Sequence, residues 1–231
     1  MIPWELLGSA QISGSGEKLC LFRRGREFSI RVNGCELMNS RAHGSEDALA
    51  DLACARIADR DRAHVLIGGL GMGYTAAAAL RRLGSGSRVV VAELVPAVVE
   101  WNREFLADLA GRPLQDPRVT VQEADVAGIL RTGHGAFDMI LLDVDNGPAG
   151  LTRKANDWLY SPSGLEAAYT ALTPGGVLAV WSAVPDSAFT KRLSRAGFRV
   201  EEVRVRARGS GGGGRHTIWL ARSRTPAGPG P

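Results

Sequence analysis

Acidic residues follow three short apolar runs of this chain, at positions where a carboxylate can contact a ligand. They are Glu93, Asp125, Asp143 and Asp145. A carboxylate accepts hydrogen bonds from ribose hydroxyls and amino groups, and it can take a proton from an amine. If the apolar runs are parallel strands of one sheet, their carboxyl ends lie at the same edge. The four acids are then expected to converge on one site.

A glycine-rich turn follows a further apolar run, residues 65–68. It carries Gly69, Gly71 and Gly73, which lack the Cβ atom that would block a sharp bend or a close ligand. The helix expected over 74–80 would direct its free N–H groups toward that ligand. Glu93 lies about 20 residues beyond the turn, the spacing at which nucleotide-binding folds place an acid on a ribose. We therefore expect these four residues to bind a nucleotide.

Composition excludes several classes of protein. The 231 residues are 45% hydrophobic, enough for one sizeable core. No apolar run is long enough to span a membrane, and the first residues lack the layout of a signal peptide. The three cysteines have no metal-binding or disulfide spacing. These features predict a cytoplasmic protein with no metal and no membrane contact. The net charge of +4 comes without a basic cluster interleaved with aromatic residues, so no nucleic-acid partner is expected either.

The first part of the chain differs from the remainder. Short runs at 19–22, 27–32 and 36–38 alternate in polarity, and Asn33-Gly34 is a strong hairpin signal. We expect a small antiparallel β-unit over residues 1–44. A helix is predicted to begin at Ser45 and to extend to about Ile57, with its apolar residues on one face.

Strands and helices alternate through residues 45–222, which predicts a doubly wound α/β domain with a mostly parallel sheet of seven strands. The expected strands are 65–68, 88–93, 118–121, 137–142, 177–181, 199–206 and 217–221. Only a short glycine loop joins the last two, so they must form a terminal antiparallel hairpin. Residues 223–231 are rich in proline and glycine and are predicted to be a disordered tail.

The order of these motifs resembles the spermidine synthases, the polyamine aminopropyltransferases with a methyltransferase-type fold. The matching segments are 68–73 (GGLGMG), 92–100 (AELVPAVVE), 116–119 (DPRV), 123–125 (EAD), 137–143 (FDMILLD) and 172–178 (LTPGGVL). The resemblance covers about residues 15 to 205. It implies polyamine biosynthesis, in which an aminopropyl group moves from decarboxylated S-adenosylmethionine to a small amine acceptor.

The resemblance also implies roles for single residues. Glu93 would bind the ribose hydroxyls, Asp125 the adenine amino group, and Leu94 would lie against the adenine ring. Asp143 would be the base, because only a neutral amine attacks the carbon next to a sulfonium and most alkylamines are protonated near pH 7.

The expected acceptor half lies in the segment after residue 142. Asp145 and Asn146 are expected to contact the acceptor, with Asp145 on a distal ammonium. The ring of Trp158 or Tyr160 would lie against an alkylammonium. This half departs from the family, because the segment here reads Asp-Val-Asp-Asn-Gly-Pro instead of Asp-Ser-Ser-Asp-Pro.

A second departure lies on the first helix. Leu49 and Ala50 stand where the family carries a Tyr-His pair. The sequence therefore predicts an acceptor pocket that is less polar on that side and a poor fit for putrescine.

Other functions stay open from the sequence. The turn Gly69-Leu70-Gly71-Met72-Gly73 also resembles methyltransferases, so a small-molecule methyltransferase that uses S-adenosylmethionine is the main alternative. A non-catalytic nucleotide-binding module is another. A dinucleotide-dependent oxidoreductase fits Gly71-x-Gly73-x-x-Ala76, but Asp125 and the terminal hairpin favour an S-adenosyl ligand. A homodimer is compatible with the family resemblance.

Overall fold

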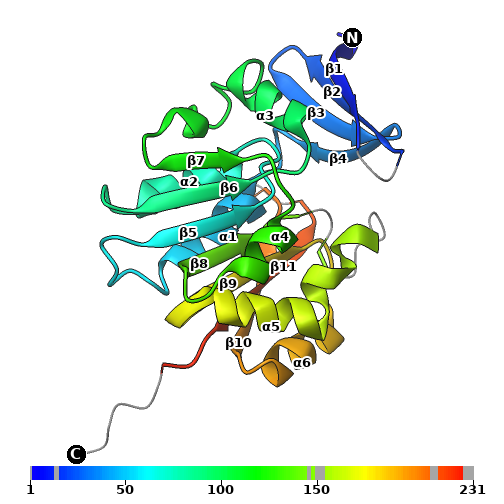
Figure 1. The fold of residues 1–231 in the computed structure, drawn as a ribbon. Helices are drawn as coiled ribbons and strands as arrows, with labels where there is room; N and C mark the ends of the chain where they lie inside the picture. Colours follow the sequence, from blue (N-terminus) through cyan, green and yellow to red (C-terminus); the bar gives the residue numbers. More distant parts are fainter. Residues whose placement is uncertain (1, 13–15, 145–146, 149–153, 209–212, 226–231) are drawn as a thin grey trace, which may run out of the picture.

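The computed structural model describes residues 2–12, 16–144, 147–148, 154–208 and 213–225, and its strands form two separate sheets (Figure 1). The smaller sheet is antiparallel throughout, in the order β1-β2-β3-β4. Its strands are β1 (Glu5–Gln11), β2 (Lys18–Arg24), β3 (Glu27–Val32) and β4 (Cys35–Asn39). Asn33 and Gly34 both have positive φ at the β3–β4 turn, as an Asn-Gly hairpin requires.

The larger sheet has seven strands in the order β10-β11-β9-β8-β5-β6-β7. They are β5 (His64–Gly68), β6 (Arg88–Ala92), β7 (Val119–Gln122), β8 (Phe137–Leu142), β9 (Leu172–Ser182), β10 (Arg199–Arg206) and β11 (Arg215–Arg222). Strands β5 to β9 pair in parallel, and β11 pairs antiparallel with both β9 and β10. The chain order reverses between β5 and β8, which is where such sheets bind ligands.

Helices cover both faces of this sheet. The helices are α1 (Gly44–Cys54), α2 (Tyr74–Arg82), α3 (Pro96–Arg103), α4 (Val126–Thr132), α5 (Pro162–Ala171) and α6 (Ser187–Arg195), with short 3₁₀ turns η1 (Pro113–Gln115) and η2 (Lys154–Tyr160). One apolar core packs α1, α2 and α3 against the sheet, and the other packs α4, α5 and α6 against it. In Figure 1, α4 and α5 lie in front of the strands and α1 and α2 behind them.

Alternation along each central strand divides its residues between the two cores. Val65 and Ile67 of β5 belong to the core under α1 to α3, whereas Leu66 belongs to the core under α4 to α6. Met139 and Leu141 of β8 belong to the core under α1 to α3, whereas Ile140 and Leu142 belong to the other core. Because both faces are buried, these strands are continuous apolar runs, as expected of parallel strands.

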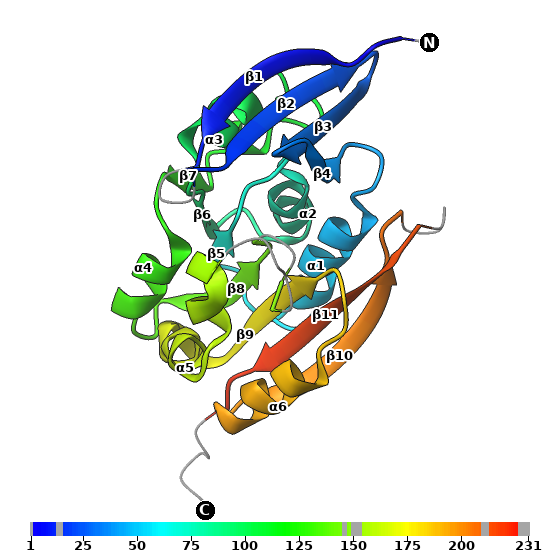
Figure 2. The same cartoon turned by 90° about the vertical axis from the view of Figure 1, so that its right-hand side faces the viewer.

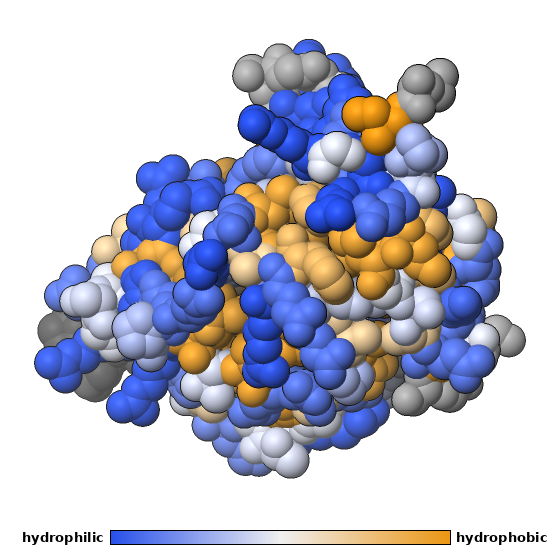
Figure 3. Space-filling model, turned by 90° about the horizontal axis from the view of Figure 1, so that it is seen from above, coloured by the Kyte–Doolittle hydropathy of each residue, from blue (hydrophilic) through white to orange (hydrophobic). Residues whose placement is uncertain are grey.

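The small sheet packs across the carboxyl-end edge of the large one (Figures 1 and 2). Leu19, Leu21 and Ile30 of the small sheet belong to the same core as α1 to α3. Seen from the side of the small sheet, apolar surface is interrupted by hydrophilic side chains (Figure 3). The exposed apolar residues of the described chain include Leu6 of β1 and Phe105 just after α3.

The predicted fold class is confirmed, together with the terminal antiparallel hairpin. Three details differ from the prediction: β9 begins at Leu172, α1 ends at Cys54, and a strand that was not predicted spans 5–11. Leu172 pairs with Phe137 and Val177 with Met139, so the expected turn at 173–176 lies in a register shift of this ladder. Ser223 belongs to the folded body, since its N–H donates to the carbonyl of Gly176 and the side chain is buried. The remainder of the predicted tail lies largely outside the described residues.

Candidate active site

The glycine turn after β5 is shaped by the neighbouring strand β8. Gly69 has φ of 90°, and a Cβ atom there would lie 2.3 Å from the carbonyl oxygen of Asp143. Gly71 has φ of 54° and lies against Met38 of the small sheet. The turn therefore needs glycine both for its conformation and for its contacts. Gly69 and Gly71 line a cavity at this edge, while Gly73 instead forms the start of α2.

Glu93 directly follows β6, and its buried side chain bonds to two backbone segments at this edge of the sheet. Its Oε2 accepts from the N–H of Leu70 at 2.9 Å, and its Oε1 accepts from the N–H of Val95 at 2.8 Å. The carboxylate thus connects the glycine turn to the start of α3, and it also lines the cavity.

Asp125 and Leu94 lie in the same cavity. Asp125 is the N-cap of α4, because its Oδ1 accepts from the N–H of Ala127 at 2.9 Å. Leu94 is 40% exposed, as a side chain that covers a ligand ring would be. The structure thus brings Gly69, Gly71 and all three predicted nucleotide-binding side chains to one cavity.

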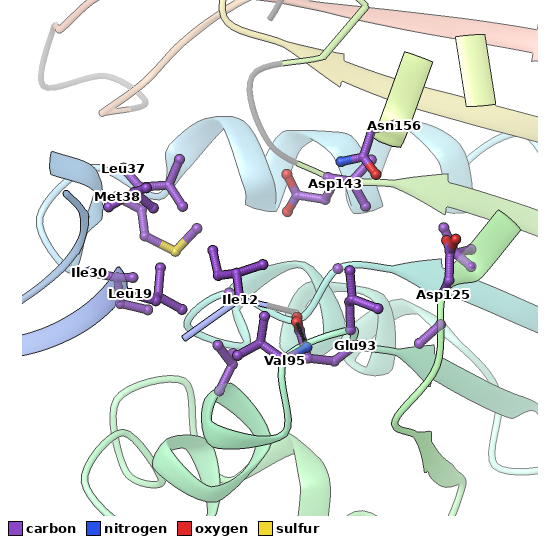
Figure 4. Close-up of a pocket in the computed structure, with 18 of the residues that line it drawn as sticks. Ile12, Leu19, Ile30, Leu37, Met38, Glu93, Val95, Asp125, Asp143 and Asn156 are labelled. Atoms are coloured by element: carbon purple, nitrogen blue, oxygen red, sulfur yellow. Dashed lines mark hydrogen bonds between the residues drawn. The ribbon is translucent and has the colours of Figure 1, made fainter. Parts of the chain in front are cut away.

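The opposite wall of this first cavity comes from the small sheet and was not predicted. Its apolar side chains are Ile12, Leu19, Ile30, Val32, Leu37 and Met38 (Figure 4). Alternation in β2 and β3 marks an apolar face, but the sequence does not say what that face packs against. Asn156 of η2 also lines the cavity, beside Asp143 in Figure 4, and was likewise not predicted.

Asp143 directly follows β8, and its N–H donates to the carbonyl of Gly68. The hydroxyl of Thr75 donates to its Oδ2 at 2.6 Å. Burial raises the pKa of the Asp143 carboxyl above its ordinary value, although the Thr75 hydrogen bond lowers it. Asp143 lines the first cavity and also a second one, and so stands between them.

The second cavity lies between α1, α2, β4 and the ends of β9 and β11. Its polar and aromatic walls include Glu36, Glu46, Tyr74, Thr75, Asp143, Trp181 and His216. Burial and the charge of Asp143 raise the pKa of Glu46 to about 7. Among the described residues that line this cavity, none is Lys or Arg. A cavity with acidic and aromatic walls suits a cationic ligand.

Two predicted acceptor contacts are not in these walls. Trp158 packs on the α4-to-α6 core, with the guanidinium of Arg131 at 4.0 Å from its ring centroid. Tyr160 is buried in the same core, and its hydroxyl donates to the carbonyl of Val144. Neither ring lines either cavity. Asp145 and Asn146 lie outside the described residues.

Leu49 and Ala50 do not form the predicted wall of the acceptor pocket, whereas the poor fit for putrescine stays a prediction. Both side chains are fully buried in the core beneath α1 and do not line the second cavity. The wall on that side is formed by Glu46, Tyr74 and His216 instead. Sequence spacing alone does not reveal these positions, because His216 reaches the site only through strand pairing at the far end of the chain.

Within the described residues no group of three or more His, Cys, Asp or Glu side chains is arranged to hold a metal ion. A search of the same residues for helices found none long and apolar enough to cross a membrane.

Comparisons with known proteins give a consistent answer. A model of the spermine/spermidine synthase domain matches residues 46–192, well over half of the chain. Polyamine aminopropyltransferases from Mycobacterium tuberculosis and Mycobacterium bovis are 31% identical over 198 residues. The match covers 82% of this chain but only 36% of those relatives, so the chain spans about a third of their length.

Solved structures share the fold. A spermidine synthase from Thermotoga maritima aligns with a TM-score of 0.74 at 19% identity, covering 94% of this chain and 72% of that one. A spermidine synthase in complex with the transition-state analogue AdoDATO gives a TM-score of 0.73 with the same identity and coverage. A probable spermidine synthase from Corynebacterium glutamicum gives 0.66 at 16% identity, covering 94% and 79%. On the domain model and the mycobacterial relatives, the chain belongs to the spermine/spermidine synthase family.

Proposed function

We propose that this protein transfers an aminopropyl group from decarboxylated S-adenosylmethionine to a small amine. The observation that carries the proposal is the place of Asp143, which lines the Glu93 and Asp125 cavity on one side and the acidic, aromatic cavity on the other. A nucleotide in the first cavity and an amine in the second would meet beside this carboxylate.

In the proposed complex the first cavity holds the adenosyl group. Glu93 accepts from the ribose hydroxyls, Asp125 accepts from the adenine amino group, and Leu94 covers the ring. The apolar wall from the small sheet supports this arrangement, because it excludes water around the sulfonium-bearing chain. Family membership supports decarboxylated S-adenosylmethionine as the co-substrate.

Asp143 acts on the amine. An alkylammonium gives up a proton to the carboxylate, and the freed lone pair attacks the aminopropyl carbon bound to sulfur. The C–N bond forms as the C–S bond breaks, and methylthioadenosine leaves with the electron pair on sulfur. Burial favours this role because it raises the pKa of Asp143 and so makes the carboxylate a stronger base. Thr75 holds the carboxylate in place.

The proposed setting is the cytoplasm, where thiols such as the buried Cys54 stay reduced. The expected homodimer and the expected lack of a nucleic-acid partner stay predictions.

Product analysis tests the proposal. The purified protein is incubated with putrescine and either decarboxylated or intact S-adenosylmethionine, and the nucleoside product is identified. Release of methylthioadenosine from the decarboxylated substrate, dependent on the amine, is expected. Release of S-adenosylhomocysteine from intact S-adenosylmethionine would instead identify a methyltransferase. Binding of both nucleotides with no transfer to any amine would favour a non-catalytic module.

A further inference from the structure

Ser45 connects two side chains of the second cavity that come from distant parts of the chain. Its hydroxyl donates to Oε2 of Glu46 at 2.5 Å, and its Oγ lies 2.9 Å from Nδ1 of His216. A hydroxyl has one hydrogen, and here Glu46 receives it. The Nδ1 of His216 must therefore carry the hydrogen that it shares with Ser45. The three residues form a directed chain of hydrogen bonds that ends on the Glu46 carboxylate.

The surroundings fix this chain in place. Ser45 is fully buried, so bulk water does not compete for its hydroxyl. The edge of the His216 ring packs against Trp181, with centroids 4.7 Å apart at an interplanar angle of 76°. Glu46 and His216 both line the second cavity, as does Asp143. The chain therefore orients one acidic side chain toward the ligand space that Asp143 also faces.

We propose that Glu46 is a second acidic group of the acceptor site, and that His216 is a positioning residue that holds Glu46 through Ser45. Glu46 and Asp143 together bind the ammonium of the acceptor amine. This inference rests on the proposed function and goes beyond it, since it assigns acceptor binding to residues of α1 and β11.

The charges around Glu46 favour a cationic ligand. Asp143 faces it from the end of β8, and Glu36 lines the same cavity from β4. Asp47 neighbours it on α1 and is bound to Arg81 at 2.9 Å and to His43 at 2.7 Å. Arg81 is therefore already paired with Asp47, and none of the described residues lining the cavity is Lys or Arg.

Two further titratable groups near Glu46 stay neutral around pH 7. Burial lowers the pKa of His216, so its ring donates a hydrogen bond without adding a positive charge. Burial and the nearby acids Glu46 and Asp47 raise the pKa of Tyr74 to about 12. When Glu46 and Asp143 are ionised, the substrate ammonium is therefore the group that supplies their counter-charge.

Acceptor binding should then strengthen with rising pH. Burial and the charge of Asp143 raise the pKa of Glu46 to about 7, so the cavity gains a further negative charge near neutrality. The amine itself stays protonated between about pH 6 and pH 8, because alkylammonium groups titrate near pH 10. We expect the KM for putrescine to fall about 10-fold across this interval, the size of a charge-assisted hydrogen bond.

Steady-state kinetics with saturating decarboxylated S-adenosylmethionine and varied putrescine test the inference from pH 6 to pH 9. Glu46→Gln should raise the KM at pH 8 about 10-fold with a much smaller change in kcat. Its KM should also lose the pH dependence near 7. Calorimetric titration of putrescine into protein saturated with methylthioadenosine gives the same comparison without turnover.

Separate variants test the positioning role of His216. His216→Leu and Ser45→Ala remove the chain of donors, so the pH midpoint of kcat/KM for putrescine should move up by about 0.5 unit or more. His216→Asn offers an amide N–H near the position of Nδ1 and should restore the wild-type midpoint. Arg215→Ala, on the exposed neighbour in β11, is the matched control and should leave the profile unchanged.

The outcomes separate the inference from the proposed function. A wild-type protein that neither binds putrescine nor releases methylthioadenosine overturns both. A wild-type protein that transfers, with a Glu46→Gln variant of equal KM and unchanged pH profile, overturns only the role of Glu46. Equal pH midpoints for wild type and His216→Leu overturn the role of His216. Thermal melting of each variant verifies that it is folded.

Discussion

Single acidic residues at this site combine structural and chemical roles. Glu93 bonds two backbone N–H groups with its two oxygens, and Asp125 caps α4 with one of its own. These contacts hold the carboxylates in fixed orientations before any ligand enters. Preorganisation of this kind reduces the cost of binding, because the side chains do not need to be ordered by the ligand.

Replacement of Glu93 should therefore affect both ligand binding and stability. Glu93→Ala leaves the buried N–H groups of Leu70 and Val95 without their acceptor, so the free energy of unfolding should fall by about 2 kcal/mol. Affinity for methylthioadenosine should fall about 10-fold or more as the ribose contact is lost. Urea unfolding and calorimetric titration measure the two effects. Asp125→Ala, which removes one N-cap, is the control and should cost only about 1 kcal/mol. An unchanged dissociation constant in folded Glu93→Ala would remove Glu93 from the site.

The proposed base gives a different pattern. Asp143→Asn keeps the shape of the side chain and a partner for Thr75 but loses the negative charge. Turnover should fall by about 100-fold or more, the usual contribution of a positioned general base. Methylthioadenosine affinity should change far less, since Glu93 and Asp125 bind that half of the ligand. Single-turnover rates measure the effect on transfer, and calorimetric titrations measure the effect on nucleotide affinity. A variant that loses nucleotide affinity but keeps its transfer rate would place Asp143 in nucleotide binding.

The protonation of Glu46 should also appear in stability. Its pKa rises from an ordinary 4.5 to about 7 on folding, so between these values the folded state holds a proton that the unfolded state has lost. The titration of Glu46 is therefore expected to lower wild-type stability as pH rises from about 4.5 to 7. Glu46→Gln has no such titration and should be more stable than wild type at pH 8 by about 1–3 kcal/mol, with little difference at pH 4. Urea midpoints at both pH values measure this. Equal pH dependence in the two proteins would show that Glu46 ionises normally.

At the level of elements, the glycine turn is the feature that the sequence predicts best. Strand, turn, helix, strand and acid occur in order, and the structure has β5, the turn, α2, β6 and Glu93 in the same places. The sequence does not reveal that Gly69 lies against the backbone of Asp143, because Asp143 follows a different strand.

A substitution pair isolates this contact. Gly69→Ala should destabilise the protein by about 3 kcal/mol or more, because the new methyl group would meet the backbone of Asp143 and φ is positive. Gly111→Ala is the matched control, since Gly111 has φ of 75° but nothing within 4 Å of the added Cβ. It should cost only about 1 kcal/mol. Urea unfolding measures the stability of both variants. Equal losses of stability would mean that the backbone of Asp143 moves away from the added methyl group at no cost.

The elements that the sequence missed share a physical cause. Strand β1 and the start of β9 are stabilised by pairing with β2 and β8, and not by strong local patterns. The expected turn at Thr173-Pro174-Gly175-Gly176 lies in a register shift of the β8–β9 ladder, and β9 begins before it because Leu172 pairs with Phe137. Tertiary pairing outweighs local propensity at such edges. The wall of the second cavity was missed for the same reason, because the contact between His216 and Ser45 depends on the pairing of β11 in the sheet.

At the scale of the whole molecule, the small sheet acts as one wall of the nucleotide cavity. The sequence predicted a separate β-unit but not its packing partner. The structure shows that Leu19, Ile30 and Met38 face the cavity across from Glu93. The affinity for the nucleotide should therefore depend on how the small sheet is docked against the large domain, and not only on the residues that contact the ligand.

Gly8 tests this dependence at a distance from the ligand. It lies in β1 against α3, and a Cβ atom at this position would be 2.5 Å from Nε1 of Trp101. Trp101 is only 5% exposed, so its indole has little room to move, and Gly8→Ala should displace β1 from α3. We expect a loss of about 1–3 kcal/mol in stability, typical of an overpacked contact, and a several-fold weaker methylthioadenosine affinity. Gly128→Ala is the control, because Gly128 lies within α4 and an added Cβ would meet nothing within 4 Å. That change should stabilise the protein slightly. A folded Gly8→Ala protein with wild-type affinity would show that the site does not depend on how the small sheet is docked.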